Sequence, residues 1–183
     1  MHEPIEGSAA VRLRPATLGD VELLTLWRSS SLYYGEFNDF GVVADLPPFD
    51  ERIKKNGLVS EQGGTLMVER FAGKRAIGTV SWRQVRYGPN PESVAWNIGI
   101  SLIPEMRGLG FGSQAQRLLA DHLFATTSVN RVEAGTDIDN LAEQRALDKA
   151  GFNREGVLKG AQYRARAWRD LVIYAVVRPR SAS

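Results

Sequence analysis

The sequence predicts a single α/β domain in which strands alternate with helices. Its 183 residues, 43% of them hydrophobic, can bury one good core and are too few to make two average domains. Segments with strand-like and helical periodicity follow in the order strand, two helices, three strands, helix, strand, helix and two strands. A glycine-rich loop connects the last of the three central strands to the next helix. We expect the domain to span residues 11–179, after a flexible tail at residues 1–10.

The N-terminal half is expected to hold a strand, two helices and a β-hairpin. Thr17 and Asp20 are spaced like a capping box, with Asp in place of the usual Glu, and apolar residues follow at helical spacing. A turn that contains Gly73 separates two strand-like runs, which is typical of a hairpin. Residues 29–48 show no clean period. The predicted elements are a strand at 11–14, helices at 18–28 and 49–58, and hairpin strands at 65–70 and 75–83.

The C-terminal half is expected to hold four strands and two helices. The first helix places His122 on its apolar side, and we interpret this histidine as a packed residue without a catalytic role. We interpret Trp82, Trp96 and Trp168 as core residues. The predicted elements are a strand at 93–103, a helix at 110–125, a strand at 131–136, a helix at 141–149, and strands at 156–164 and 168–177.

The composition excludes several kinds of chemistry. Cysteine is absent, so the chain can form no disulfide, thiolate metal site or covalent cysteine intermediate. Histidine occurs only as His2 and His122, and we predict no metal site. No apolar run reaches the length of a membrane span, and the N-terminus lacks the pattern of a signal peptide, so we expect a cytoplasmic protein. A net charge of +2 gives no global field that requires nucleic acid.

The most informative stretch is the loop Arg107-Gly108-Leu109-Gly110-Phe111-Gly112-Ser113. Glycine lets successive N–H groups turn toward one point, and the start of the following helix adds the positive end of its dipole. The loop therefore predicts a phosphate cradle. A tight strand-to-helix connection without a ligand is the alternative. A dinucleotide-binding loop is disfavoured because its third glycine would fall on Ser113, and a P-loop is excluded because its Gly-Lys-Ser/Thr is missing.

Three groups of residues resemble the GNAT superfamily of acyl-CoA-dependent N-acyltransferases. They are the motif Arg107-x-x-Gly110-x-Gly112, Asn140 followed eleven residues later by Gly151-Phe152, and the tail segments 154–159 and 168–174. The tail is similar to the RimJ/RimL-like branch, which includes ribosomal-protein N-acetyltransferases. The resemblance covers about residues 11–178. It implies a mixed, mostly antiparallel sheet that is splayed at the CoA site and flanked by helices.

The resemblance also implies a site for acetyl-CoA as the acyl donor. In the family, the loop amides hold the pyrophosphate of CoA, and the pantetheine arm lies beside the strand that contains residues 100–102. Splayed strands expose unpaired amides and carbonyls, which suits an amide-bearing arm. The implied cofactor-binding residues are Ile100, Ser101, Leu102, Arg107, Gly108, Leu109, Gly110, Phe111, Gly112, Ser113, Asn140, Arg145 and Lys149.

Four of these residues are expected to act through their side chains. Arg107 would add positive charge near the phosphates. Asn140 is placed either as a plain helix cap or as a cap that also contacts pantetheine. Arg145 and Lys149 lie four residues apart, where they could meet the phosphates or form a solvated helix face.

The segment between the first helix and the hairpin has an uneven charge. Residues 29–51 contain no Lys or Arg, whereas five acidic residues are interleaved with aromatic ones. In the family this segment helps to form the acceptor groove, and an acidic, aromatic groove would attract a cationic amine. A solvated loop whose aromatic residues close the core is the alternative. The expected acceptor-binding residues are Tyr33, Tyr34, Glu36 and Asp39.

Three residues at positions linked to catalysis in the family differ from the family pattern. Asn97 stands where many relatives carry a Glu on the central strand, Glu143 where the branch often has Ser, and Leu147 where other members have a proton-donating Tyr. Asn97 cannot act as a general base but could orient a water or the acceptor. Glu143 could transfer a proton if partial burial raised its pKa. Tyr174 and Tyr163 are reserve donors, and the predicted catalytic residues are Asn97, Glu143 and Tyr174.

These residues predict an enzyme that transfers an acetyl group from acetyl-CoA to a primary amine by direct attack in a ternary complex. The acceptor is a protein N-terminus or a small-molecule amine, and the enzyme is a monomer or homodimer. Two alternatives stay open: another donor, such as a longer acyl-CoA or an aminoacyl-tRNA, and a degenerate module that binds acyl-CoA without turnover. A basic C-terminal tail leaves room for an RNA contact, although such a tail is more often a solvated strand face. Its residues are Lys159, Arg164, Arg166, Arg169, Arg178 and Arg180.

Overall fold

The computed structural model describes residues 10–41 and 46–179, and it confirms the predicted α/β fold. Residues 1–9 of the expected tail lie outside these ranges. The helices, short 3₁₀ turns aside, are α1 (Val21–Arg28), α2 (Ser31–Tyr34), α3 (Phe49–Asn56), α4 (Phe111–Thr126) and α5 (Leu141–Lys149). The strands are β1 (Val11–Arg14), β2 (Val59–Ser60), β3 (Gly63–Arg70), β4 (Ala76–Arg86), β5 (Val94–Leu102), β6 (Arg131–Asp137), β7 (Asn153–Arg164) and β8 (Ala167–Val177).

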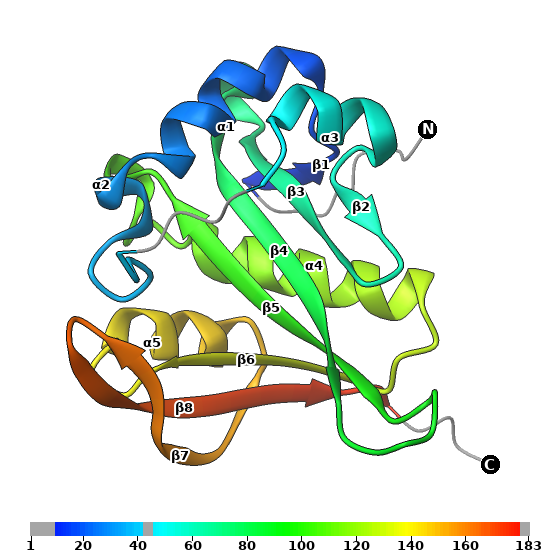
Figure 1. Cartoon of the computed structure of the whole chain (residues 1–183), viewed down its shortest axis with the longest axis vertical. Coiled ribbons are helices and arrows are strands. Elements are labelled where there is room, and N and C mark those ends of the chain that lie inside the picture. The colour runs from blue at the N-terminus through cyan, green and yellow to red at the C-terminus, as the bar shows by residue number, and fades with distance from the viewer. Residues whose placement is uncertain (1–9, 42–45, 180–183) are drawn as a thin grey trace.

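The described strands form one twisted sheet. Its order is β1-β3-β4-β5-β6-β8-β7, and the two-residue strand β2 pairs with β3. Neighbouring strands run antiparallel except β5 and β6, which are parallel. Figure 1 shows β5 and β6 meeting near one end and diverging toward the other. The sheet is therefore two antiparallel halves that touch at a single parallel contact.

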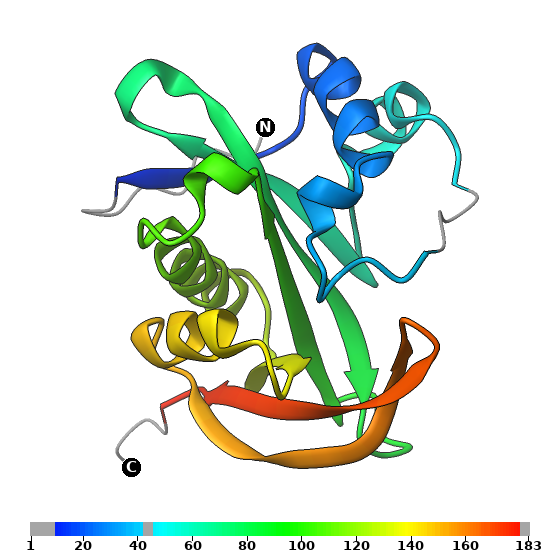
Figure 2. The same ribbon diagram turned by 90° about the vertical axis from the view of Figure 1, so that its left-hand side faces the viewer.

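Helices cover the two faces of the sheet differently. Figure 2 shows α4 and α5 on one face and α1, α2 and α3 on the other. Leu119 of α4 and Leu147 of α5 are fully buried, and so are Val80 of β4 and Val132 of β6. Burial of this apolar surface is the main force that holds the helices to the sheet. Helices α4 and α5 thus pack on the face of the sheet that carries the β5–β6 junction, with α4 contacting β5 and α5 contacting β6.

The start of the first helical segment confirms the predicted capping box. The Thr17 amide donates to Asp20 Oδ2 at 2.8 Å, and the Asp20 amide donates to the Thr17 carbonyl at 2.9 Å. The carboxylate of Asp20 also accepts two hydrogen bonds from Arg14, each 2.8 Å long. These bonds hold the pKa of Asp20 below its usual value although burial opposes them. Asp20 therefore joins the helix start to the edge strand β1.

Two short elements and one core assignment differ from the sequence prediction. The sequence showed no period at α2, which is a single turn whose start is capped by Ser30 Oγ accepting from the Tyr33 amide at 3.3 Å. Strand β2 has only two residues. Trp168 is 69% exposed, so its core assignment is wrong, because the tip of the β7–β8 hairpin extends beyond the helices; it contacts Tyr163 edge-on at 5.4 Å.

The described residues give no membrane span and no metal cluster. No helix within 10–41 and 46–179 is long and apolar enough to cross a membrane. In the same ranges, no group of three or more His, Asp or Glu side chains is placed to hold a metal ion. His122 lies edge-on to the buried Trp82, with ring centroids 6.5 Å apart.

Candidate active site

The sheet opens between β5 and β6. These strands pair only at Trp96–Val132 and Asn97–Glu133, whereas the other edge of β6 pairs with β8 over residues 131–137. Beyond Asn97, one edge of β5 therefore has no neighbouring strand. Backbone groups along such an edge are unsatisfied by the sheet and are available to a ligand that carries amides.

The register shows which residues face this gap. The Ile103 amide donates to the Ile77 carbonyl at 2.9 Å, across the contact with β4. Because alternate residues direct their backbone groups to opposite edges, those of Ser101 face β4 and those of Ile100 and Leu102 face the gap. The Ser101 carbonyl also accepts a hydrogen bond from Tyr33 Oη at 3.1 Å. The backbone of Ser101 therefore faces β4 and not the gap, and the cofactor contact of Ser101 stays a prediction, as do those of Ile100 and Leu102.

The glycine loop lies at the end of this gap and leads into α4. Gly108 and Gly110 have φ values of +72° and +84°, the left-handed region that other residues rarely adopt, so both positions require glycine. Gly110 is the residue before the helix and has no side-chain cap. No backbone–backbone hydrogen bond within the described ranges uses the amides of residues 108–110.

The first turn of α4 adds further free donors. The first bond closed by the helix runs from the Gln114 amide to the Gly110 carbonyl, at 3.3 Å. The amides of residues 111–113 precede it and have no carbonyl one turn back in the helix. With the positive end of the helix dipole, they form the kind of site that binds phosphate. Phe111 itself is buried and anchors the turn, and Ser113 Oγ donates to the Gly110 carbonyl at 2.9 Å.

Arg107 does not have the role that the sequence predicted. Its amide donates to the Pro104 carbonyl at 3.2 Å. Its guanidinium donates to the carbonyls of Leu102, Leu32 and Tyr33 at 2.9, 2.7 and 2.7 Å. Arg107 therefore ties the end of β5 to α2 on the neighbouring segment, and it positions the loop instead of presenting charge to a phosphate. The Leu102 carbonyl at the end of β5 needs a hydrogen-bond donor, and Arg107 provides it; the spacing of residues in the sequence does not predict this contact.

The N-terminus of α5 faces the same gap from β6. Asn140 Oδ1 accepts a hydrogen bond from the Glu143 amide at 3.2 Å, which confirms Asn140 as a helix cap. Its contact with pantetheine remains a prediction. Arg145 and Lys149 are exposed on α5 without an ion pair among the described residues, so either proposed role is still open to them. Leu147 is fully buried.

Glu143 is the titratable group of this region with the most altered environment. It is partly buried, and burial raises the pKa of its carboxyl to about 7, an effect that a hydrogen bond from the Gln116 amide partly offsets. Sequence reasoning missed Gln116, which is 1% exposed on α4. Its Nε2 donates to the Gly112 carbonyl at 3.3 Å, and its Oε1 is buried without a hydrogen-bond partner. A buried polar residue inside an apolar helix face was the signal that could have identified it.

The structure separates Tyr174 from this region. Tyr174 is 2% exposed on β8, and its charged neighbours are Asp148 and Arg154. Asp148 is five residues beyond Glu143 on α5, which corresponds to about 7 Å along the helix axis. Burial raises the pKa of Tyr174, but the side chain belongs to the core. Tyr174 is therefore a core residue, and its catalytic role stays a prediction. Tyr163 is likewise remote, on the exposed tip of the β7–β8 hairpin.

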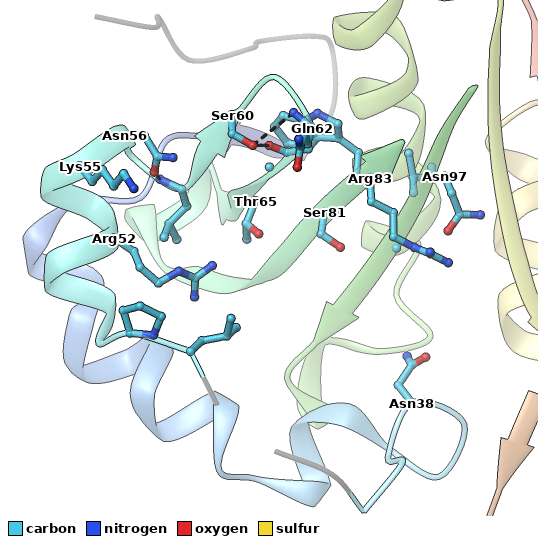
Figure 3. Close-up of a pocket in the computed structure, with 18 of the residues that line it drawn as sticks. Asn38, Arg52, Lys55, Asn56, Ser60, Gln62, Thr65, Ser81, Arg83 and Asn97 are labelled. Carbon is cyan, nitrogen blue, oxygen red and sulfur yellow. Dashed lines mark hydrogen bonds between the residues drawn. The ribbon is translucent and has the colours of Figure 1, made fainter. Parts of the chain in front are cut away.

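A groove lies on the face of the sheet opposite α4. A cavity of about 1210 Å³ is bounded by α3, the 60–65 turn, β4 and β5, and Asn97 lines it (Figure 3). A second cavity of about 550 Å³ lies beside α1 and α2. They share the lining residues Asn38, Phe40, Leu46, Ser81 and Gly99, so they form one continuous acceptor groove.

Two of the four expected acceptor residues line this groove. Tyr34 and Asp39 do. Tyr33 does not, because it is 4% exposed, stacks on Trp27 at 4.7 Å between centroids, and bonds Thr79 Oγ1 at 2.9 Å. Glu36 does not either, since its backbone carbonyl accepts from Arg164 and its side chain points to solvent. The acceptor role of Tyr33 is therefore wrong, whereas that of the exposed Glu36 stays a prediction.

The charge of the groove also differs from the expectation. Asp50 pairs with Lys54 on the surface, at 3.1 Å, and lines neither cavity; Asp45 lies outside the described residues. The sequence prediction considered residues 29–51 alone, and the cations come from elements before and after them. The described charged residues that line the groove are Asp39 and Glu51, with Arg28, Arg52, Lys55 and Arg83.

The basic C-terminal residues form no continuous patch. Arg164 is buried and pairs with the buried Asp137, and its Nη1 donates to the Glu36 carbonyl at 2.6 Å. Arg178 donates to backbone carbonyls at the end of α4, and Lys159 pairs with Asp170 at 2.7 Å. Arg180 lies outside the described residues. These contacts are structural, so the described part of the tail does not support an RNA-binding face.

A sheet that opens between two parallel strands, with a glycine loop at the opening and a groove on the opposite face, is the architecture of N-acyltransferase domains. A family model described as an acetyltransferase (GNAT) domain matches residues 10–153, and the chain belongs to this family. The chain is 34% identical over 105 residues to the probable N-acetyltransferase YjcK of Bacillus subtilis (strain 168), an alignment that covers 57% of this chain. The chain spans 56% and 62% of the lengths of two relatives from that organism.

Solved structures show the same fold at lower identity. A ribosomal L7/L12 α-N-protein acetyltransferase, RimL, in complex with coenzyme A superposes with a TM-score of 0.77 at 21% identity, covering 96% of this chain and 98% of that one. Spermidine N-acetyltransferase from Vibrio cholerae in complex with CoA and spermine gives a TM-score of 0.74 at 17% identity, covering 92% and 95%. The similarity at this identity establishes the fold.

Proposed function

We propose that this protein is an N-acetyltransferase that transfers the acetyl group of acetyl-CoA to a primary amine. The observation that carries the proposal is the row of free amides in the 108–113 loop and the first turn of α4, at the end of an open sheet edge. Family membership and the names of the relatives, which are N-acetyltransferases, support the same activity. A location in the cytoplasm is part of this proposal.

The residues of the opening fit the parts of coenzyme A. The amides of Gly108 to Ser113 would bind the pyrophosphate, because they are unpaired donors at the positive end of a helix dipole. The backbone groups of Ile100 and the amide of Leu102 would pair with the amides of pantetheine, as an added strand does, since the Leu102 carbonyl already accepts from Arg107. The side-chain amide of Asn140 remains available on the opposite side of the gap. When bound, acetyl-CoA supplies the thioester whose acyl group is transferred.

The reaction needs an uncharged amine, an acceptor for the one proton that its nitrogen loses and a donor of one proton to the leaving thiolate. The amine nitrogen forms a bond to the thioester carbonyl carbon, the carbon–sulfur bond breaks, the nitrogen loses a proton to water, and the CoA thiolate gains one. Glu143 is proposed to donate the proton to sulfur, since a carboxyl with a pKa of about 7 is substantially protonated near neutral pH. Asn97, which lines the groove beside the opening, is proposed to orient the acceptor amine. It has no acid–base chemistry of its own.

Release of the CoA thiol tests the activity directly. The protein is incubated with acetyl-CoA and a panel of protein N-terminal peptides, amino acids, aminoglycosides and polyamines, and the thiol is measured with a chromogenic disulfide. Amine-dependent thiol release and an acetylated amine in the mass spectrum are expected. Binding of CoA by calorimetry without turnover of any amine would instead identify a degenerate module. A longer acyl-CoA that outperforms acetyl-CoA would overturn the assignment of the acyl group.

A further inference from the structure

Two arginines from different helices lie against the same aromatic ring at one end of the acceptor groove. The guanidinium carbon of Arg28, at the end of α1, lies 4.8 Å from the centroid of the Phe49 ring, and that of Arg52, on α3, lies 5.3 Å from the same ring. Neither arginine forms an ion pair with an acidic residue in the described part of the chain. Two like charges are thus held against one aromatic ring.

This arrangement is unfavourable unless something else neutralises it. Nη1 of Arg28 is buried without a hydrogen-bond partner, although a guanidinium nitrogen withdrawn from water normally has an acceptor. Burial and the charge of Arg28 lower the pKa of Arg52, which reports the same repulsion from the other side. Cation–π contact with Phe49 compensates part of the charge but provides no acceptor for an N–H group. The described residues thus leave Nη1 of Arg28 without the acceptor that an oxyanion would supply.

Both arginines belong to the groove that would hold the acceptor. Arg28 lines the smaller cavity and Arg52 the larger one. Figure 3 shows Arg52 extending from α3 into the cavity and Arg83 extending from β4 toward Asn97. The carboxylates present are spread out: Asp39 Oδ1 accepts from the Gly41 amide at 2.9 Å, and Glu51 is exposed. The described lining therefore has an excess of positive charge.

We propose that the acceptor amine carries an oxyanion, a carboxylate or a phosphate, that binds to Arg28 and Arg52 beside the Phe49 ring. This inference rests on the proposed function and names the substrate class of the same site. Helices α1 and α3, which carry Arg28 and Arg52, lie on the face of the sheet opposite α4 (Figure 2), so these arginines are separate from the loop proposed for the phosphates of CoA. A planar guanidinium suits both carboxylate and phosphate, since it offers two parallel N–H donors. The charge would thereby select an anionic acceptor and exclude a polyamine.

Matched peptides test the charge preference. Three capped tripeptides, Ser-Glu-Gly-amide, Ser-Gln-Gly-amide and Ser-Lys-Gly-amide, differ only in the charge near a common amine, and a phosphoserine peptide represents phosphate. An alkyl set with the same spacing, 4-aminobutyrate, 4-aminobutanol and 1,4-diaminobutane, covers small amines. The anionic member of each set is expected to have a kcat/KM at least about tenfold above its neutral partner, because a charge-assisted hydrogen bond is lost in the neutral one. A phosphopeptide that exceeds the Glu peptide assigns phosphate; the reverse assigns carboxylate.

Two variants connect the preference to the arginines. Arg52→Gln is expected to raise KM for the anionic acceptor at least about tenfold and to leave the neutral acceptor unchanged. Arg28→Gln should act in the same direction, and Arg52→Lys should restore part of the preference because the charge remains without the fork. Lys54→Gln is the matched control: it removes one charge from the same helix, at a side chain that pairs with Asp50 outside the groove. Melting temperatures of all variants show whether they are folded.

Equal kcat/KM values within each set, a preference for the lysine peptide or diamine, or an unchanged preference in both folded variants would overturn the inference. None of these results would affect the proposed acetyl transfer, which is scored by thiol release from any amine. If no amine is turned over, the proposed function fails, and calorimetry of the Glu and Gln peptides with the CoA-bound protein still decides the anion site. Tighter binding of the Glu peptide that Arg52→Gln abolishes supports it, and equal binding refutes it.

Discussion

Replacing Glu143 by Gln exchanges a partly buried carboxyl for an uncharged group of the same shape. Two effects are expected. The variant loses the proposed proton donor to the CoA thiolate, so kcat falls, by about 10²–10⁴-fold if the donor is fully effective. The variant also has no ionised carboxylate, so it avoids the loss of native-state stability that burial of that charge causes. The second effect depends only on the environment of the side chain and can be measured without any substrate.

The size of the second effect follows from the pKa. Burial raises the pKa of Glu143 from 4.5 to about 7, which corresponds to about 3 kcal/mol at most. Between these two pH values the unfolded chain releases the proton and the native protein keeps it, so the native protein loses stability as the pH rises through this window. Above about pH 7 the full loss is present. A glutamine side chain does not titrate and has no such loss, so the variant should gain on the parent with rising pH.

Thermal unfolding at several pH values measures this difference. Near pH 4.5 the variant and the parent should differ little, whereas at pH 8.5 the variant should melt up to about 6–12 °C higher, from about 3 kcal/mol in a chain of this length. Glu22→Gln, at an exposed position on α1, is the control and should show no such divergence. Parallel melting curves for parent and Glu143→Gln across this pH range would refute the assigned burial. An unchanged kcat would remove Glu143 from catalysis.

Three further changes test the donor site and the packing around it. Gly110→Asp places a side chain and a negative charge at φ +84° in the proposed cradle. The affinity for CoA in a calorimetric titration should fall at least about 100-fold, which corresponds to about 3 kcal/mol of binding free energy. Gly57→Asp, at φ +64° after α3, is the control and should bind CoA normally. Tyr33→Phe loses the two hydrogen bonds of its hydroxyl and should reduce the free energy of unfolding by about 1–2 kcal/mol in urea while CoA binding stays within error, and a loss of binding would contradict its assignment to the core. Arg164→Met leaves Asp137 buried without its partner and should lower stability by about 3–5 kcal/mol; adding Asp137→Asn should restore part of it, and a single variant as stable as the parent would show that the pair contributes nothing.

Local patterns were sufficient to predict most of the fold. The helix at residues 141–149 was predicted with the bounds that the structure gives α5, because Asn140 caps it and Gly151 follows it. The hairpin of β3 and β4 followed from two strand-like runs around Gly73. The pairing of β5 with β6 could not be read from local periodicity, since it is a long-range parallel contact of two residue pairs; only the family resemblance implied it.

Side-chain roles were predictable only where they depend on neighbours in sequence. The capping roles of Asp20 and Asn140 are local, and the structure shows both. Arg107 was misassigned because its acceptors include Leu32 and Tyr33, which are more than seventy residues away. The charge of the groove was misjudged for the same reason, because Arg28 and Arg83 reach it from segments outside residues 29–51.

Two of the three departures from the family pattern, Glu143 and Leu147, are linked by the geometry of α5. Leu147 and Glu143 are four residues apart, so they lie on the same face of the helix, one turn apart. Leu147 is fully buried, whereas Glu143 lies in the first turn beside Gln116. The helix dipole at that position favours an ionised carboxylate by only about 0.3–1 kcal/mol, which burial exceeds. Gln116 suits both states of the carboxyl, because its amide can donate to the ionised form and, after a half-turn, accept from the protonated one. For the proposed acetyl transfer, the proton donor is therefore best sought at Glu143, one helical turn before the position where other family members carry a tyrosine and beside Gln116 of α4.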